Sequence, residues 1–228
     1  MPYEITYTDL GQMPYGECWQ LQRELFEGVL RAKAEGRDER GRLLMVEHPA
    51  VYTLGKSGKE ANLLVSEEYL RGLGAEYYRI DRGGDITFHG PGQAVGYPIL
   101  DLERMGLGLK DYVAALEQTV IDTVAHYGIT GGRIEGASGV WIDEKSARPR
   151  KICAIGVRAS RYVTMHGFAL NVTTDLSWFG HINPCGFTDR GVTSIEAETG
   201  IRPAMEDIKR HLCDALSKNL ENVKIYKN

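Results

Sequence analysis

The sequence lacks the features that would direct a protein to a membrane or to nucleic acid. It contains no apolar run long enough to cross a bilayer. Its first residues, MPYEITYTDLG, include neither the basic start nor the apolar stretch of an export signal. The formal net charge is −4, whereas nucleic-acid-binding proteins usually carry a basic surplus. We therefore expect a cytoplasmic protein with no membrane and no nucleic acid among its partners.

Cysteine is scarce and no pair is closely spaced. The four cysteines are Cys18, Cys153, Cys185 and Cys213, and no two form a CxxC motif. In a chain of 228 residues this spacing favours reduced thiols over a disulfide framework. The six histidines show no ligand spacing with the cysteines, so we predict no metal site.

The composition, with 43% hydrophobic and 25% charged residues, is that of an ordinary globular protein, and we find no internal repeat or low-complexity linker. We expect one catalytic domain over residues 1–228. Apolar residues at helical spacing predict helices over 14–35, 109–127 and from about 203 onward. Strand-like runs such as GVWI, KICAIGV and MHGFALNV gather in the middle of the chain, so the predicted fold class is α+β.

Two shorter features are also predicted from local pattern. The runs RLLMVEH and AVYTLG meet at Pro49 and read as a hairpin-like pair of strands. Ser66 precedes Glu67 and Glu68, a combination that favours the start of a short helix.

The stretch RGGDITFHGPGQ, residues 82–93, concentrates glycine in one loop between two strand-like runs, 75–81 and 94–100. Glycines allow main-chain N–H groups to approach a ligand, and such groups can bind an anion or a developing oxyanion. The stretch matches neither GxxxxGK[ST] nor GxGxxG, so a nucleotide site is not supported. Arg82 and His89 in the same loop favour a functional site over a simple turn.

Three further residues are candidates for chemistry. Lys151 begins an apolar run, where a lysine either extends to solvent or is desolvated for proton transfer; the stretch alone favours the first. Cys153 should share a strand face with Lys151 and is expected to be inert packing. Cys185 lies between Pro184 and Gly186. A thiol, an ammonium and a glycine-lined pocket suit acyl transfer through a thioester, without identifying the acyl group.

The remaining histidines have no partner pattern in the sequence. We expect His166 to be structural packing in its strand, and His48, His126, His181 and His211 to be structural or on the surface.

Three ordered blocks closely resemble the signature sequences of the lipoyl(octanoyl) transferases. They are RGGDITFHGPGQAVGYPI, RKICAIGVRASRYVTMHGFALNV and INPCGFTDRGVTSI, within about residues 42 to 200. The resemblance implies transfer of an octanoyl group from octanoyl-acyl carrier protein to a lysine of a lipoyl domain, without a cofactor. The implied acceptors are the 2-oxoacid dehydrogenase complexes and the glycine cleavage H protein. The implied fold is the mixed central sheet, flanked by helices, of lipoate- and biotin-protein ligases.

The resemblance also implies roles for individual residues. The nucleophile corresponds to Cys185, and Lys151 corresponds to the lysine that lowers its pKa. Cys153 and Phe88 depart from the family pattern, where a small residue and tyrosine are common. The implied acyl-binding residues are Arg82, Gly83, Gly84, Asp85, Ile86, Thr87, Phe88, His89, Ala154, Ile155, Gly156, Gly167, Phe168 and Ala169.

Two alternatives stay open at this point. An ATP-dependent lipoate ligase of the same fold would not require a nucleophilic thiol, so the proline–cysteine–glycine turn at Cys185 favours the transferase. A non-catalytic binding domain would have no reason to hold both Lys151 and Cys185. A basic patch of Arg148, Arg150 and Arg158 is a candidate docking surface for acidic partners.

Overall fold

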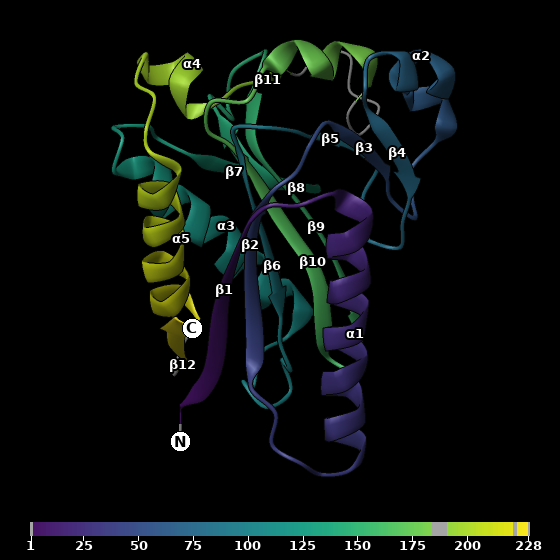
Figure 1. Cartoon of the computed structure of the whole chain (residues 1–228). Coiled ribbons are helices and arrows are strands. Elements are labelled where there is room, and N and C mark those ends of the chain that lie inside the picture. The colour runs from purple at the N-terminus through teal and green to yellow at the C-terminus, as the bar shows by residue number, and fades with distance from the viewer. Residues whose placement is uncertain (1, 184–190, 221–222, 228) are drawn as a thin grey trace.

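The computed structural model describes residues 2–183, 191–220 and 223–227. Within this part of the chain, a nine-stranded mixed sheet forms the centre of the molecule (Figure 1). β1 runs parallel to both of its neighbours, and β11 runs parallel to β9, whereas the other pairs are antiparallel. The strand order is β12 (Val223–Lys227), β1 (Tyr3–Gln12), β2 (Gly41–Glu47), β6 (Gln93–Ile99), β10 (Val163–Asn171), β9 (Arg150–Ser160), β8 (Ala137–Ile142) and β7 (Gly132–Ile134), and β11 (Gly191–Val192) pairs with β9.

Helices cover both faces of this sheet, so the predicted α+β class with a mixed, helix-flanked sheet is confirmed. α3 (Leu109–Ala125) and α5 (Met205–Asn219) contribute their apolar stripes to one core. α1 (Tyr15–Ala34) packs on the opposite side, where it forms a second core with strands β2, β6 and β10 (Figure 1). The three long helices predicted from periodicity are present within a few residues of their predicted bounds. Within the described residues, every helix is too short or too polar to cross a bilayer.

A smaller sheet adjoins the large one, and it overturns the predicted hairpin. Its strand order is β4 (Glu76–Arg79), β3 (Val51–Leu54) and β5 (Ile86–His89). β2 pairs with β1 and β6 in the large sheet, whereas β3 pairs with β4 and β5. The chain therefore crosses between sheets at Pro49. All four residues of β3 are buried. β3 is the central strand of the small sheet, with β4 on one edge and β5 on the other.

Short elements complete the small sheet's surroundings. They are η1 (Glu60–Asn62), α2 (Glu67–Gly72) and η2 (Leu176–His181), while α4 (Ile195–Thr199) follows β11. The predicted cap of α2 is confirmed, because Ser66 Oγ accepts a hydrogen bond from Tyr69 N at 3.1 Å. Strands β1 and β12 were not predicted from the sequence; they pair with each other, so residues near the two ends of the chain share one sheet edge.

Candidate active site

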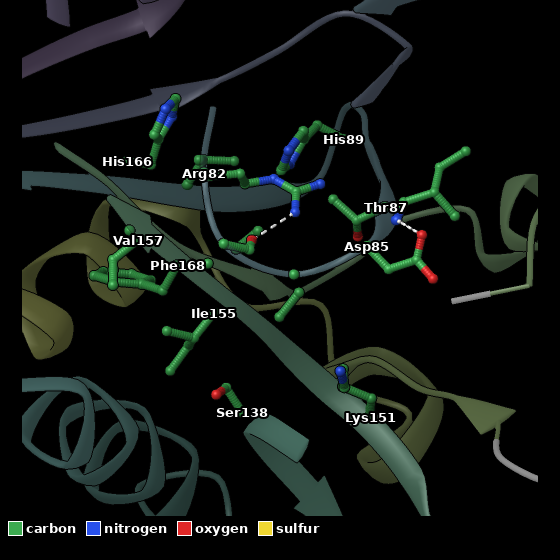
Figure 2. Close-up of a pocket in the computed structure, with 18 of the residues that line it drawn as sticks. Arg82, Asp85, Thr87, His89, Ser138, Lys151, Ile155, Val157, His166 and Phe168 are labelled. Atoms are coloured by element: carbon green, nitrogen blue, oxygen red, sulfur yellow. Dashed lines mark hydrogen bonds between the residues drawn. The ribbon is translucent and has the colours of Figure 1, made fainter. Parts of the chain in front are cut away.

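A cavity of about 410 Å³ lies between the glycine-rich loop and strands β9 and β10. Ala154 pairs with Ala169, Ile155 with Phe168 and Gly156 with Gly167, so two separate predicted segments form one continuous floor. Figure 2 shows Ile155 between Lys151 at one end and Arg82 and His89 at the other. Lys151 and Val157 lie six positions apart along β9, which corresponds to a floor about 20 Å long.

The structure brings together most of the residues that the sequence singled out. Phe88 does not line the cavity; it stacks on Trp178 with ring centres 5.3 Å apart, inside the core of the small sheet. Cys185 lies outside the described residues. The predicted residues that line the cavity are Arg82, Gly83, Gly84, Asp85, Ile86, Thr87, His89, Lys151, Ala154, Ile155, Gly156, Gly167, Phe168 and Ala169.

The glycines of the loop allow it to press directly onto β9. Gly83 N donates a hydrogen bond to Val157 O at 2.9 Å. A Cβ on Gly156 would lie 2.8 Å from Gly83 O, closer than non-bonded atoms approach. Gly84 adopts φ +87°, a left-handed conformation that favours glycine. The loop therefore covers one end of the cavity with main chain.

Arg82 and Asp85 anchor this loop. The buried guanidinium of Arg82 donates to Thr53 O at 2.7 Å and to Thr53 Oγ1 at 2.9 Å. Asp85 accepts hydrogen bonds from Ile86 N at 2.7 Å and from Lys59 N at 3.2 Å. Both predicted residues thus line the cavity, and both also fix the main chain around it.

His89 belongs to a buried hydrogen-bond network. Gln93 Nε2 donates to Phe88 O and to Asn171 Oδ1, so its Oε1 must face His89 Nδ1, 2.8 Å away. That oxygen can only accept, so Nδ1 carries the proton. Burial lowers the pKa of His89 to about 3, and the imidazole is therefore neutral near pH 7. Its ring stacks on Tyr15 at 5.9 Å.

His48 and Tyr97 extend the same neutral cluster. His48 Nδ1 donates to Met13 O at 2.7 Å, which leaves Nε2 to accept from Tyr97 Oη at 2.9 Å. Burial lowers the pKa of His48 to about 4. The His48 and His89 rings meet edge to face, 6.0 Å apart. Tyr15, Tyr97, Gln93 and Asn171 line the cavity without having been predicted as site residues.

His166, expected to be packing alone, lines the cavity and is held by a charged partner. Its Nε2 donates to Asp81 Oδ1 at 2.8 Å, and its main-chain N donates to Gln22 Oε1 at 3.1 Å. His166 has φ +60° within β10, a conformation that strains a non-glycine residue. The hydrogen bond from His166 is the largest factor that lowers the pKa of Asp81, which also pairs with Arg158.

Lys151 and Cys153 do not share one environment, contrary to the prediction from strand alternation. Lys151 is half-buried and lines the cavity, with Nζ 4.6 Å from the centre of the Trp141 ring. Cys153 is fully buried in the main core, and burial raises the pKa of its thiol. A register shift between Val140 and Trp141 places Val140 opposite Cys153 and Trp141 opposite Lys151. This bulge interrupts the alternation of faces.

The predicted basic patch does not extend to Arg158. Arg150 pairs with Asp143 at 2.9 Å and with Glu198 at 3.0 Å. Arg158 pairs with Asp81 about 26 Å further along β9. The described residues contain no cluster of His, Cys, Asp and Glu arranged to hold a metal ion.

Comparisons with known proteins agree with this geometry. Residues 14–217 match the model of the lipoyl protein ligase A/B catalytic domain. An octanoyltransferase of Bacteroides fragilis is 56% identical over 205 residues, which cover 90% of this chain and 93% of the relative. Its name accords with the acyltransferase class predicted from the sequence.

Two solved structures share the fold at low sequence identity. A bi-partite lipoate protein ligase of Thermoplasma acidophilum superposes with a TM-score of 0.69 at 14% identity, covering all of this chain and 87% of the other. A biotin protein ligase of Aquifex aeolicus gives a TM-score of 0.51 at 12% identity, over 97% and 70% of the two chains. With the family model matched over most of its length, the chain belongs to the lipoyl protein ligase A/B catalytic domain family.

Proposed function

We propose that the protein transfers an octanoyl group from octanoyl-acyl carrier protein to a lysine side chain of a lipoyl domain. The acceptors would be the lipoyl domains of 2-oxoacid dehydrogenase complexes and the glycine cleavage H protein. The relatives named octanoyltransferase, which match 90% or more of this chain, support the reaction class. The observation that carries the proposal is the cavity that places Lys151 beside an apolar floor.

The floor suits a flexible acyl chain. Ile155, Phe168 and Ala169 present hydrocarbon to the cavity. Gly156 and Gly167 have no Cβ, which allows main chain to pack closely against the floor at Gly83 and Gly96. Burial is worth about 0.8 kcal/mol per CH₂, so each methylene seated on this surface adds to binding. The cavity can therefore discriminate between acyl chains that differ by several carbons.

The chain connectivity allows Cys185 to reach this cavity. Asn183 N donates to Asn62 O at 2.8 Å, and Asn62 in turn contacts Asp85 at the cavity wall. Cys185 follows Asn183 by two positions in the sequence. On the far side of Cys185, Gly191 pairs with Arg150, the neighbour of Lys151. We infer that Cys185 is the nucleophile beside Lys151.

The reaction proceeds in two steps, acylation of Cys185 and transfer of the acyl group to the acceptor lysine. The Cys185 thiolate attacks the thioester carbonyl of the donor, a new thioester forms on the enzyme, and the carrier thiolate leaves and takes up a proton. A neutral lysine amine of the acceptor then attacks the enzyme thioester. An amide forms, the amine loses a proton, and the Cys185 thiolate is released. The ammonium of Lys151 stabilises the thiolate and exchanges protons in both steps.

The proposal is tested by supplying octanoyl-carrier protein and an apo lipoyl domain with no ATP. We expect the mass of the lipoyl domain to increase by one octanoyl group. The second candidate function, an ATP-dependent ligase, is favoured by the lipoate protein ligase of Thermoplasma acidophilum, which shares the fold. Modification that requires ATP and free fatty acid, with none from the carrier protein, would support the ligase and overturn the transferase.

A matched pair of cysteine variants tests the nucleophile. Cys185→Ser should abolish the acyl-enzyme adduct, because a serine hydroxyl is not appreciably ionised by a nearby ammonium. Cys153→Ala should retain most turnover, since that thiol is buried in the core. Full activity of Cys185→Ser, or a folded but inactive Cys153→Ala, would show that the wrong sulfur has been assigned. An absence of any adduct on an intact wild-type chain would favour a non-catalytic binding domain.

A further inference from the structure

The indole of Trp141 lies against the side chain of Lys151. Lys151 Nζ is 4.6 Å from the centre of the ring, within the range of a cation–π interaction. Trp141 is only 2% exposed, and its Nε1–H donates to Ala137 O at 3.0 Å. The ring is therefore fixed in orientation by its own strand. Lys151, in contrast, has a long side chain with many rotamers.

The local backbone is arranged so that these two side chains meet. If the register of Val140 with Cys153 continued unchanged, Trp141 would lie opposite Ile152, and Lys151 opposite Ile142. The bulge instead places Trp141 opposite Lys151, while Val140, Ile152 and Cys153 all join the main core. One inserted residue in β9 thus turns Lys151 toward the cavity.

Strand β8, which carries Trp141, is held in place by a hydrogen bond to helix α3. Glu117 of α3 is buried, and its Oε1 accepts from Gly139 N at 3.0 Å while its Oε2 accepts from Arg133 Nε at 3.0 Å. Gly139 has φ +125°, and a Cβ there would collide with Cys153 O. These contacts fix β8 to α3 and allow it to approach β9 closely at Gly139, two residues before Trp141.

We propose that Trp141 is a positioning residue of the acyl transfer, and that its indole face holds the Lys151 ammonium at the cavity wall. This inference rests on the role proposed for Lys151. A π face favours the charged form of the amine and restricts its side chain to one region. Lys151 is then available as a localised cation where the thiolate forms.

Two substitutions separate the π face from simple packing. Trp141→Phe keeps an aromatic face, whereas Trp141→Leu keeps apolar volume without one. We expect kcat to fall by about 2- to 30-fold in Trp141→Leu, the range for a partly desolvated cation–π contact. Trp141→Phe should recover much of this loss, and KM for the octanoyl-carrier protein should change by less than about twofold. Equal kcat in the two variants, at equal thermal stability, would overturn the proposal.

A second measurement does not depend on folding of these variants. Tryptophan analogues with increasing numbers of fluorine atoms can be placed at position 141, because fluorine withdraws density from the π face with little change in shape. We expect an amine-reactive reagent at constant pH to label Lys151 faster with each added fluorine, relative to exposed Lys145 on the same chain. The same analogues at Trp178, which stacks on Phe88, should leave Lys151 labelling unchanged. No change across the series at position 141 would overturn the proposal.

The labelling assay also separates this inference from the proposed function, since it requires no acyl substrate. A stepwise rise in Lys151 labelling without an acyl adduct on Cys185 would support the Trp141 contact and contradict the transferase. A Cys185 adduct with Lys151 labelling unchanged by fluorination would support the transferase and overturn the role of Trp141.

Discussion

The two ends of the cavity are held in different ways. At the His89 end, the imidazoles of His48 and His89 are buried and uncharged. His48 bonds to Met13 O and Tyr97 Oη, and His89 bonds to Gln93, whose amide in turn bonds to Asn171. At the Lys151 end, a half-buried ammonium lies on the face of Trp141, and the strand around it is irregular. The first end gives the cavity its shape, and the second places a positive charge at the cavity wall.

The glycine-rich loop closes the His89 end of the cavity by packing its main chain on β9. The hydrogen bond from Gly83 N to Val157 O fixes the loop to β9, and the missing Cβ of Gly156 permits the approach. If this comparison is correct, substitutions at the two ends should differ in kind. Those at the Lys151 end should affect turnover, and those at the His89 end should affect stability and its dependence on pH.

Removal of the charge at the Lys151 end should have the largest effect. We expect Lys151→Ala to reduce turnover by about 10²- to 10⁴-fold, the usual contribution of an acid–base group. The pKa of the Cys185 thiol should rise, so iodoacetamide should label it more slowly near neutral pH. The exposed Lys145 provides the matched control, Lys145→Ala, which should behave as wild type. Unchanged labelling of Cys185 in Lys151→Ala would remove the role assigned to the lysine.

The His89 end predicts a loss of stability in acid. The folded-state pKa values of His89 and His48, about 3 and about 4, lie below the unfolded value near 6.5. Between these values only the unfolded chain takes up the protons, so the stability present above pH 6.5 is lost as the pH falls. We expect the free energy of unfolding to drop by about 2 kcal/mol per histidine between pH 7 and pH 5.

This pH dependence is measured by urea unfolding at both pH values. His89→Gln and His48→Gln should each reduce the decrease by about 2 kcal/mol, whatever their stability at pH 7. A decrease that is as large in both variants as in wild type would contradict the neutral assignment of this end.

A methyl group where the glycine-rich loop contacts β9 should produce an intermediate effect. In Gly156→Ala the new Cβ would lie 2.8 Å from Gly83 O, a main-chain atom that can move only with its loop. We expect a loss of stability of about 1–3 kcal/mol, with weaker octanoyl transfer. Hydrogen exchange at Gly83 N should accelerate, because its bond to Val157 O would lengthen. Protection of that amide at the wild-type level would show that the loop is not seated as described.

The smallest effect is expected at a glycine outside the cavity. Gly28 lies within α1, and a Cβ there would have no atom within 4 Å. Gly28→Ala should therefore raise the free energy of unfolding by about 0.5–1 kcal/mol and leave turnover unchanged. This variant is the control for Gly156→Ala, and a loss of turnover in it would show that glycine substitutions affect the site indirectly.

Local patterns in the sequence were sufficient for the three long helices and for the two strands that form the cavity floor. The stripes on α3 and α5 follow helical spacing, and β9 and β10 are apolar runs that pair through a short turn. The choice of strand partners was not a local property. β2 and β3 follow one another in sequence yet pair in different sheets, because their partners come from distant segments.

The candidate site shows the same division. The glycine loop and Lys151 stand out by composition and position, and the structure places both at the cavity. The Asp81–His166 pair could not be found in this way, since 85 positions separate the two residues and neither is unusual where it stands. The face of Cys153 was predicted wrongly because a one-residue bulge changes the register of β9 against β8. No residue type in that segment indicates a bulge.

The central claim is that Cys185 carries the acyl group as a thioester. It is tested most directly by incubating the intact chain with octanoyl-carrier protein alone, followed by peptide mass mapping at mildly acidic pH. We predict one octanoyl group, sensitive to hydroxylamine, on the peptide that contains Cys185. An adduct on Cys153 or another residue, or a modified lipoyl domain formed without any enzyme-bound intermediate, would contradict it.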